Sequence, residues 1–312
     1  MFNSKFSTLA AGVAVAFGAI GAANALTLTA GNYKITLDNY DSGTLYKTPA
    51  LGSGNNVICT TVASCDTAAT LGGIPAPASV GSVNPSADTN GIFSIALITN
   101  ISTGQVEYVK GTAGTVGGVA IGPYLTGVFG NLSDRYVETT CGALTCSTTG
   151  LAVGGTFSIF NNAADWNPGN FGVAPFDLNA LTYKSISDTA SSLFLSGVFA
   201  AGAVFAGDAT ASYQTTYNSS TFAGNGQGFL DFTGGSALPF FNTNSLTNAN
   251  GGTNDAFLTT AFDDVNGAAS ALGWTVKSVS QVSGLIPEPG SLALVALALL
   301  GLGVSTRRHS KS

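Results

Sequence analysis

The stretch WTVKSVSQV, residues 274–282, largely alternates apolar and polar side chains. Successive side chains of a strand point to opposite faces of a sheet, so this alternation predicts a strand with one buried face. Working outward, AFLTTAF at 256–262 and GFLDF at 228–232 are also strand-like, and IFSIALIT at 92–99 indicates a buried strand. The chain between such runs is rich in Gly, Asn and Pro, which are turn residues.

Several shorter segments also indicate strands. They are residues 26–37 around a Gly-Asn break, 105–110, 135–140, 156–160, 180–186, 193–205 and 210–217 with its alternating Tyr. Residues 38–43 form a polar cluster that predicts a turn, and residues 71–90 predict a loop. Neither a helical period nor a fixed-period repeat is present. We therefore expect a mainly β fold, an antiparallel, jelly-roll-like β-sandwich, in one domain over residues 26–284.

Composition supports a β protein with a packed core. Only 8% of the 312 residues are charged, 41 are Gly, and aromatic residues at 10% supply enough bulk for a core. Residues 26–286 include fifteen acidic and six basic residues, which gives an excess of nine negative charges. Without a basic patch, nucleic-acid binding is not expected.

The N-terminal end has the three parts of a secretory signal peptide. Lys5 is followed by an apolar region at residues 9–23, and Ala23-Asn24-Ala25 is a small-x-small cleavage site. We expect residues 1–25 to be removed after export by the Sec machinery, which leaves Leu26 as the mature N-terminus. The alternative is a retained N-terminal transmembrane helix, which the short, Gly-interrupted run disfavours.

The C-terminal end places a short apolar span before basic residues. Pro287-Glu288-Pro289 is followed by residues 291–305 without charge, and Arg307 and Arg308 close the span. Fifteen residues reach about 22 Å as a helix, so crossing a ~30 Å hydrocarbon core needs snorkelling Arg and local thinning. The predicted transmembrane helix is anchored by Leu292, Leu294, Leu297, Leu299, Leu300 and Leu302. The Arg pair should stay in the cytoplasm, with the preceding chain outside.

This order of tripeptide, apolar span and Arg cluster resembles the PEP-CTERM sorting signal of Gram-negative bacteria. The resemblance covers residues 285–310, with Ile286 where Val is usual. It implies recognition by an exosortase, a membrane transpeptidase that cuts near the tripeptide, after transient anchoring in the inner membrane. It also implies a cell-surface or matrix protein of an organism that makes exopolysaccharide. The alternative is a plain tail anchor with a chance Pro-Glu-Pro.

The cysteines and the single histidine limit the chemistry. In an exported chain, Cys59, Cys65, Cys141 and Cys146 should form disulfides, and two local pairs are the simplest of three connectivities. The one His is His309 in the tail, so residues 26–284 cannot form a Ser-His-Asp site or a His-ligated metal site. We expect no enzymatic activity, no metal and no cofactor.

Three functions remain open. The first is a structural or adhesive protein of the cell surface or biofilm matrix. The second is a carbohydrate-binding module, with Trp166 in a loop as the candidate sugar contact, and with calcium at turn-like Asp38, Asp41, Asp263 and Asp264 as an optional aid. The third and weakest is a glycan-cleaving enzyme with two carboxylates, for which Glu107, Glu138 and many Asp are available.

Overall fold

A computed structural model describes residues 33–42, 46, 49–71, 88–116, 119–165, 176–177, 182–183, 186, 192–202, 208–219, 221, 223–264 and 274–285. The elements are β1 (Tyr33–Ser42), β2 (Gly54–Cys59), α1 (Val62–Leu71), β3 (Asp88–Asn100), β4 (Val106–Val109), β5 (Gly114–Val116), β6 (Val119–Ile121), β7 (Tyr124–Cys141), β8 (Cys146–Asn162), β9 (Phe176–Asp177), β10 (Thr182–Tyr183), β11 (Ser192–Ala200), β12 (Tyr213–Asn218), β13 (Gly224–Gly234), α2 (Leu238–Phe241), β14 (Leu246–Thr247), β15 (Thr253–Asn254), β16 (Ala256–Asp264) and β17 (Val276–Gly284).

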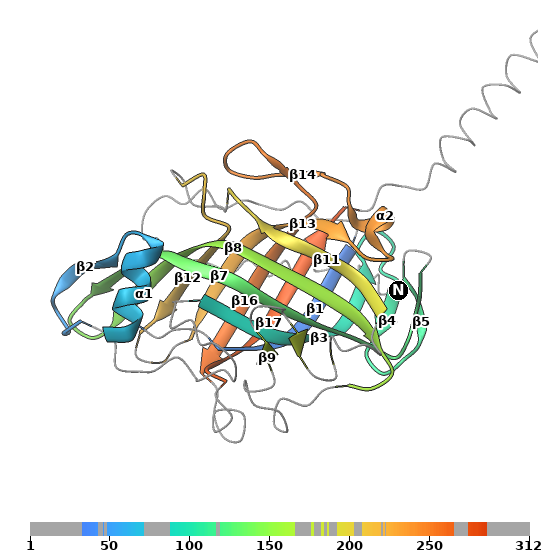
Figure 1. Ribbon diagram of the computed structural model, residues 1–312, viewed down its shortest axis with the longest axis horizontal. Coiled ribbons are helices and arrows are strands. Elements are labelled where there is room, and N and C mark those ends of the chain that lie inside the picture. The colour runs from blue at the N-terminus through green and yellow to red at the C-terminus, as the bar shows by residue number, and fades with distance from the viewer. Residues whose placement is uncertain are drawn as a thin grey trace, which may run out of the picture.

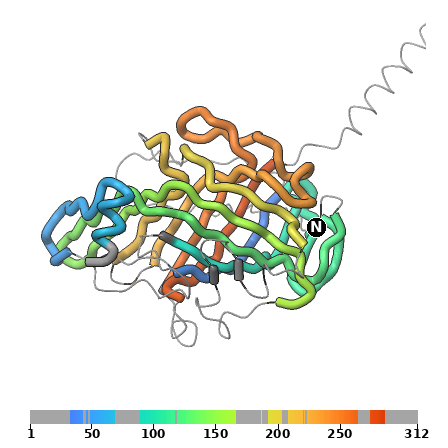
Figure 2. The backbone as a smooth tube through the Cα atoms, in the orientation of Figure 1, coloured from blue at the N-terminus to red at the C-terminus, as the bar shows by residue number. Residues whose placement is uncertain are grey.

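The main sheet closes on itself. Eight strands follow one another as β8, β12, β13, β16, β17, β1, β3 and β7, and the β7–β8 pairing completes the ring (Figure 1). All these pairings are antiparallel. β11 also pairs with β8 and β13, farther along the same two strands than β12. Figure 2 shows the first described strand beside the last one, in blue and orange-red.

Closure corrects the predicted sandwich. The fold is mainly β and antiparallel as expected, but eight of the described strands close into one barrel-like sheet where the sequence predicts two facing sheets. A closed sheet leaves few unpaired strand edges, which is one way in which β proteins avoid edge-to-edge aggregation. The alternation within each strand predicts a buried face equally well for both architectures, so it cannot choose between them.

Long, bent strands make closure possible. β7 has 18 residues and β8 has 17, and they pair along most of their length. Their pairing is interrupted where Asn131 (φ 60°) lies opposite Gly154 and Gly155 (φ 73° and 97°). Positive φ is the region that glycine and asparagine tolerate best, and such irregularities bend a strand.

The core fills one end of the closed sheet. The inward-facing Tyr33, at the start of β1, is fully buried, and α2 covers this end with Phe241. The Tyr33 and Phe241 rings meet edge to face with centroids 5.0 Å apart, and Phe194 and Phe232 contact Phe241 at 6.2 and 5.9 Å. We call this end of the molecule the α2 end.

The two disulfides lie beyond the opposite end. Cys59–Cys65 joins β2 to α1, and Cys141–Cys146 links β7 to β8 across their connection. The simplest of the three connectivities is therefore the one present. β2 and α1 extend this part of the molecule outside the closed ring, where β2 pairs with the end of β7 (Figure 1).

The helix α1 was not expected, because its sequence VASCDTAATL carries no apolar stripe. Its start is fixed locally: the Thr61 amide donates to Oγ of Ser64 at 2.9 Å, and the Ser64 amide donates to Oγ1 of Thr61 at 3.2 Å. Reciprocal bonds of this kind satisfy amides that a helix start leaves unpaired.

Within the described residues, no helix combines the length and the apolar character needed to cross a membrane. The predicted signal peptide, the Pro-Glu-Pro tripeptide, the transmembrane span and the Arg pair lie outside the described residues.

Candidate functional site

Two adjoining cavities lie inside the closed sheet. Their volumes are about 90 Å³ and about 80 Å³. They adjoin because both are lined by the same five residues, Asp41, Thr89, Leu132, Tyr213 and Thr260. We call the first the polar chamber and the second the apolar chamber.

The apolar chamber is the part nearer to the α2 end. Its wall is formed mainly by Phe, Ile, Leu and Val side chains from strands all around the ring. They are Ile35, Leu37, Phe93, Ile95, Phe129, Phe157, Ile159, Phe199, Leu230, Phe232, Leu258 and Val282. An apolar wall of this kind favours an apolar occupant.

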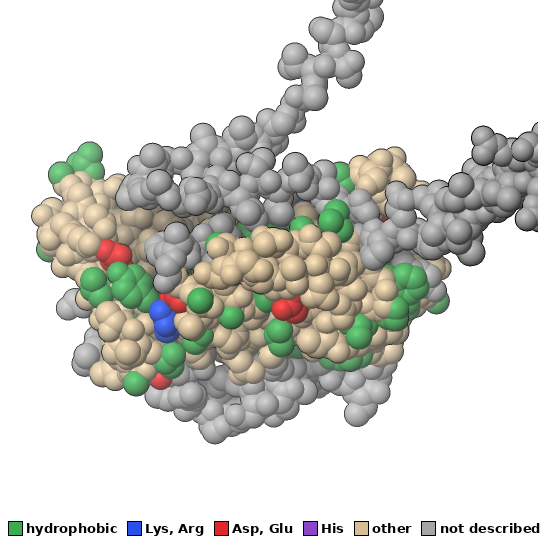
Figure 3. Space-filling view, turned by 90° about the horizontal axis from the view of Figure 1, so that it is seen from above, with side chains coloured by type: hydrophobic (Ala, Val, Ile, Leu, Met, Phe, Trp, Pro, Cys, Tyr) green, Lys and Arg blue, Asp and Glu red, His purple; other side chains and the backbone are tan. Residues whose placement is uncertain are grey.

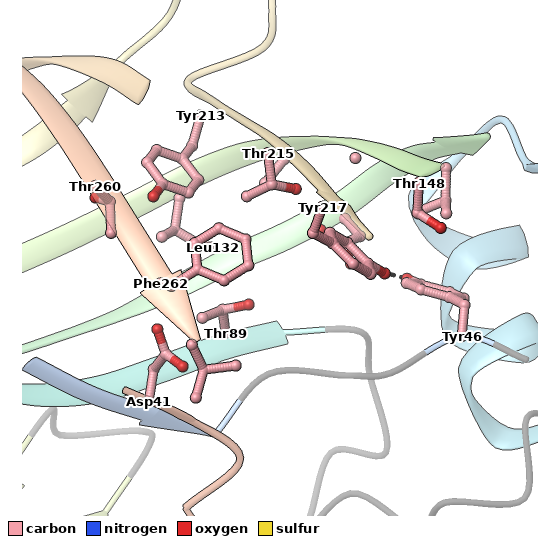
Figure 4. A pocket seen from close by; sticks show the side chains of 15 residues that line it. Asp41, Tyr46, Thr89, Leu132, Thr148, Tyr213, Thr215, Tyr217, Thr260 and Phe262 are labelled. Carbon is pink, nitrogen blue, oxygen red and sulfur yellow. Dashed lines mark hydrogen bonds between the residues drawn. The ribbon is translucent and has the colours of Figure 1, made fainter. Parts of the chain in front are cut away.

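The polar chamber, whose lining side chains are drawn in Figure 4, is the part farther from the α2 end. Hydroxyl and carboxyl groups enter it from β1, β3, β7, β8, β12 and β16 and from Tyr46, which follows β1. They belong to Asp41, Tyr46, Thr89, Asp134, Thr148, Tyr213, Thr215, Tyr217 and Thr260. These groups can bind a polar ligand head by hydrogen bonds.

The inward row of β1 explains this division. Its odd-numbered residues face the interior, and the row changes from Tyr33, Ile35 and Leu37 to Asn39 and Asp41. The prediction of a turn at 38–43 is therefore wrong for residues 38–42, which belong to β1. Asn and Asp favour turns over strands. Inside a closed sheet, however, they can belong to a strand when hydrogen-bond partners are available to their side chains.

Asn39 has such partners. Its Oδ1 accepts a hydrogen bond from the Ser278 hydroxyl and lies 3.2 Å from Oγ of Ser280. Oγ of Ser280 is in turn 3.1 Å from Oγ1 of Thr260. This network joins β1, β17 and β16 at the boundary of the two chambers, and it satisfies the buried polar groups there.

Asp41 has no such partner. Its Oδ1 is buried and accepts no hydrogen bond from any described residue. Burial disfavours the charged form, which raises the pKa of this carboxyl from 3.8 to about 8. Asp41 lines both chambers, so an unsatisfied carboxyl group lies where the polar and apolar walls meet.

The tyrosines provide neutral hydroxyls. Burial raises the pKa of Tyr213 and Tyr217, and burial together with the Asp134 carboxylate raises the pKa of Tyr46. The Tyr46 hydroxyl donates to Oδ2 of Asp134 at 2.8 Å. All three stay protonated at neutral pH and can donate or accept hydrogen bonds.

Glycine at one inward position makes room for a ring. A Cβ at Gly226 of β13 would lie 1.9 Å from the Tyr213 hydroxyl oxygen, so the ring lies over bare backbone. The neighbouring strand segment 213–217 was predicted from its alternating Tyr, which is the one signal in the sequence for this site. The convergence of Asp41, Tyr46 and Tyr217 was missed, because it depends on the pairing of distant strands.

The predicted calcium ligands are not gathered. Asp38 and Asp41 belong to β1, on opposite faces, and Asp263 and Asp264 belong to the end of β16, so none of them lies in the expected turns. Among the described residues, no three His, Cys, Asp or Glu side chains lie close enough to hold a metal ion.

The other predicted site residues are not in the cavity. Trp166 lies outside the described residues. Glu138 accepts a hydrogen bond from the Tyr136 hydroxyl at 2.9 Å, and the Asn100 side chain lies 3.4 Å from Glu107; neither carboxylate lines a chamber. The cavity instead brings together Asp41 and Asp134, which the sequence did not single out as a pair.

Comparisons with known proteins identify the C-terminal segment. The model of the PEP-CTERM protein-sorting motif matches residues 285–308, directly after β17 ends at Gly284. No curated protein and no solved structure matches the chain. The motif agrees with the resemblance based on Pro287-Glu288-Pro289, and it implies an exported protein that an exosortase sorts. This chain therefore carries a PEP-CTERM protein-sorting motif at residues 285–308.

Proposed function

We propose that the protein is a structural or adhesive component of the cell surface or extracellular biofilm matrix, with exopolysaccharide as its partner. The sorting motif at residues 285–308 carries this proposal, since it directs the preceding domain to the outside of the cell. The inner membrane holds the chain through the span around Leu292 until an exosortase cuts near Pro287-Glu288-Pro289.

Features of the described domain support this role. The face of the described domain in Figure 3 displays few charged side chains, as expected for a chain with 8% charged residues that is rich in Gly, Ser, Thr and Asn. Such a surface can exchange hydrogen bonds with neutral polysaccharide. The closed sheet and two disulfides suit a protein that must persist outside the cell.

Intact-mass analysis of the protein from its own host tests sorting. We expect a chain that begins at Leu26, ends near residues 287–290 and has four oxidised cysteines. Glu288→Ala should retain the tail, while Glu107→Ala, a matched change in β4, should leave processing unchanged. A wild-type mass that includes residues 292–312 would refute exosortase processing.

The matrix role needs a separate test. Deleting the gene should reduce the polysaccharide retained on the cell surface, and the wild-type gene should restore it, while the Glu288→Ala variant should not. Equal retention in the deletion strain and the wild type would refute the matrix role without affecting the assignment of the sorting motif.

The carbohydrate-binding and glycan-cleaving alternatives stay predictions. A glycan array with and without chelator distinguishes the first from a purely structural role, with Trp166→Ala as the variant. For the second, Asp41 and Asp134 share a chamber, so Asp134→Asn is the variant to compare in a screen of glycan hydrolysis.

A further inference from the structure

The apolar chamber is a void where a β protein normally has packed side chains. Interiors are usually filled to crystal-like density, and lining atoms that face a void lose their contacts. Here a cavity of about 80 Å³ is lined by aromatic and aliphatic side chains from all around the ring. A closed sheet of eight strands has an interior that can either be filled by side chains or hold one small ligand.

The carboxyl group of Asp41 marks one point of that interior as incomplete. A buried polar atom without a partner is costly, and native structures contain few of them. Oδ1 of Asp41 is such an atom among the described residues, and it lies at the junction of the two chambers. A ligand that donates a hydrogen bond at this point would remove the cost.

The charge of the lining selects the type of donor. Among the described residues, Asp41 and Asp134 bring carboxyl groups to the chambers, and neither Lys nor Arg lines them. An anionic ligand head would therefore meet acidic groups without a compensating cation. The rings of Tyr213 and Tyr217 in the polar chamber add faces that attract cations.

We infer that the two chambers together bind a small organic amine, with its apolar body in the apolar chamber and its ammonium group at Asp41. The ammonium donates to Oδ1 of Asp41, and the carboxyl group releases its proton to solvent and carries a negative charge in the complex. The remaining ammonium protons face the hydroxyls of the polar chamber, such as those of Thr89 and Thr260 (Figure 4).

The cavity volumes limit the ligand. Each chamber, at about 90 or 80 Å³, is smaller than the ~150 Å³ engineered cavity that holds benzene. A ligand must therefore extend through both chambers, and together they have room for about one ring with a short chain. Lipids and oligosaccharides are too large for this space.

Three probes with one ring and different heads test the inference: 2-phenylethylamine, 2-phenylethanol and phenylacetate. They are titrated calorimetrically into the exported protein purified from its host. A charge-assisted hydrogen bond is stronger than a neutral one, so we expect the amine to bind about tenfold more tightly than the alcohol. Phenylacetate should not bind measurably.

Two variants and one control locate the binding. Asp41→Asn should reduce amine affinity to the level of the alcohol. Ala152→Leu, which adds bulk to the wall of the polar chamber, should weaken both ligands. Asp38→Asn removes a carboxylate from the outward face of the same strand and should bind as the wild type does.

Four results would overturn the inference: no saturable binding of any probe, equal binding of amine and alcohol, a preference for the amine that persists in Asp41→Asn, or unchanged affinity in Ala152→Leu. Circular dichroism of each variant verifies the fold. The sorting assay on Glu288→Ala is separate, so binding and sorting can fail independently.

Discussion

Substituting Asp41 should change how stability depends on pH. The pKa of this carboxyl is about 8 in the folded protein, against 3.8 ordinarily. Between these values the folded chain keeps a proton that the unfolded chain has lost. The free energy of unfolding is therefore highest at low pH and falls as pH rises through this window, with a limiting slope of about 1.4 kcal/mol per pH unit.

Few other groups titrate in this range, because the chain contains a single His, at position 309. Water that enters the chamber lowers the slope, so we expect a loss of at least about 2 kcal/mol between pH 5 and pH 8. In Asp41→Asn the side chain cannot ionise, and this loss should disappear. The variant should then be more stable than the wild type at pH 8.

Urea unfolding at pH 5, 6, 7 and 8 measures this dependence. The wild type, Asp41→Asn and the outward-facing control Asp38→Asn are compared with their disulfides intact. Asp38→Asn should retain the wild-type slope. The reasoning is refuted if the wild type and Asp41→Asn have parallel free energies of unfolding across the range, because Asp41 would then be ionised in the folded protein.

Three further changes test the packing. Tyr33→Phe removes a buried hydroxyl that has no partner among the described residues, so the free energy of unfolding should rise by about 1 kcal/mol; a lower melting temperature would contradict this. Asp255→Ala leaves the backbone amides of Phe232, Thr243 and Asn244 without their acceptor, and urea unfolding should show a loss of about 3–5 kcal/mol, whereas a loss below about 1 kcal/mol would mean that water replaces the carboxylate. Replacing Cys141 and Cys146 by Ala opens the β7–β8 link and should cost about 2 kcal/mol in the same assay, and an unchanged midpoint would show that the pairing of β7 and β8 suffices.

Local periodicity predicted strands well. Residues 92–99, 256–262 and 274–282 lie largely within β3, β16 and β17, because alternation and apolar runs are properties of neighbouring residues. The thirteen-residue run at 193–205 was assigned to strands on account of its glycines, and β11 occupies 192–200. The strand predicted at 105–110 is also present, as β4 at Val106–Val109.

Local periodicity could not predict which strands pair with one another. The ring closes through contacts such as those of Tyr33 with Gly284 and of Tyr213 with Ala152, which are far apart in sequence. Many pairings satisfy the same alternation, so a sandwich and a closed sheet are equally compatible with the pattern. The cavity depends on that choice, and its lining could not be predicted.

Asp41 illustrates the same limit at one residue. In the sequence it belongs to a polar cluster, and Asp in such a cluster usually forms a turn. In the structure it continues β1, and its side chain faces the interior. Side chains alternate along a strand, and Leu37 and Asn39 on the same row already face inward. Its inward direction follows from the register of β1.

The position of β17 fixes how the protein is presented on the cell. β17 is the strand that leads to the tripeptide, and only Leu285 and Ile286 separate its last residue, Gly284, from Pro287. Gly284 pairs with Tyr33, so the tether leaves from the α2 end. In the proposed anchored state, the six residues 285–290 between β17 and the predicted span allow a gap of at most about 22 Å. In that proposed state the α2 end is the end nearer to the membrane, and Asp41, the polar chamber and both disulfides lie on the side away from it.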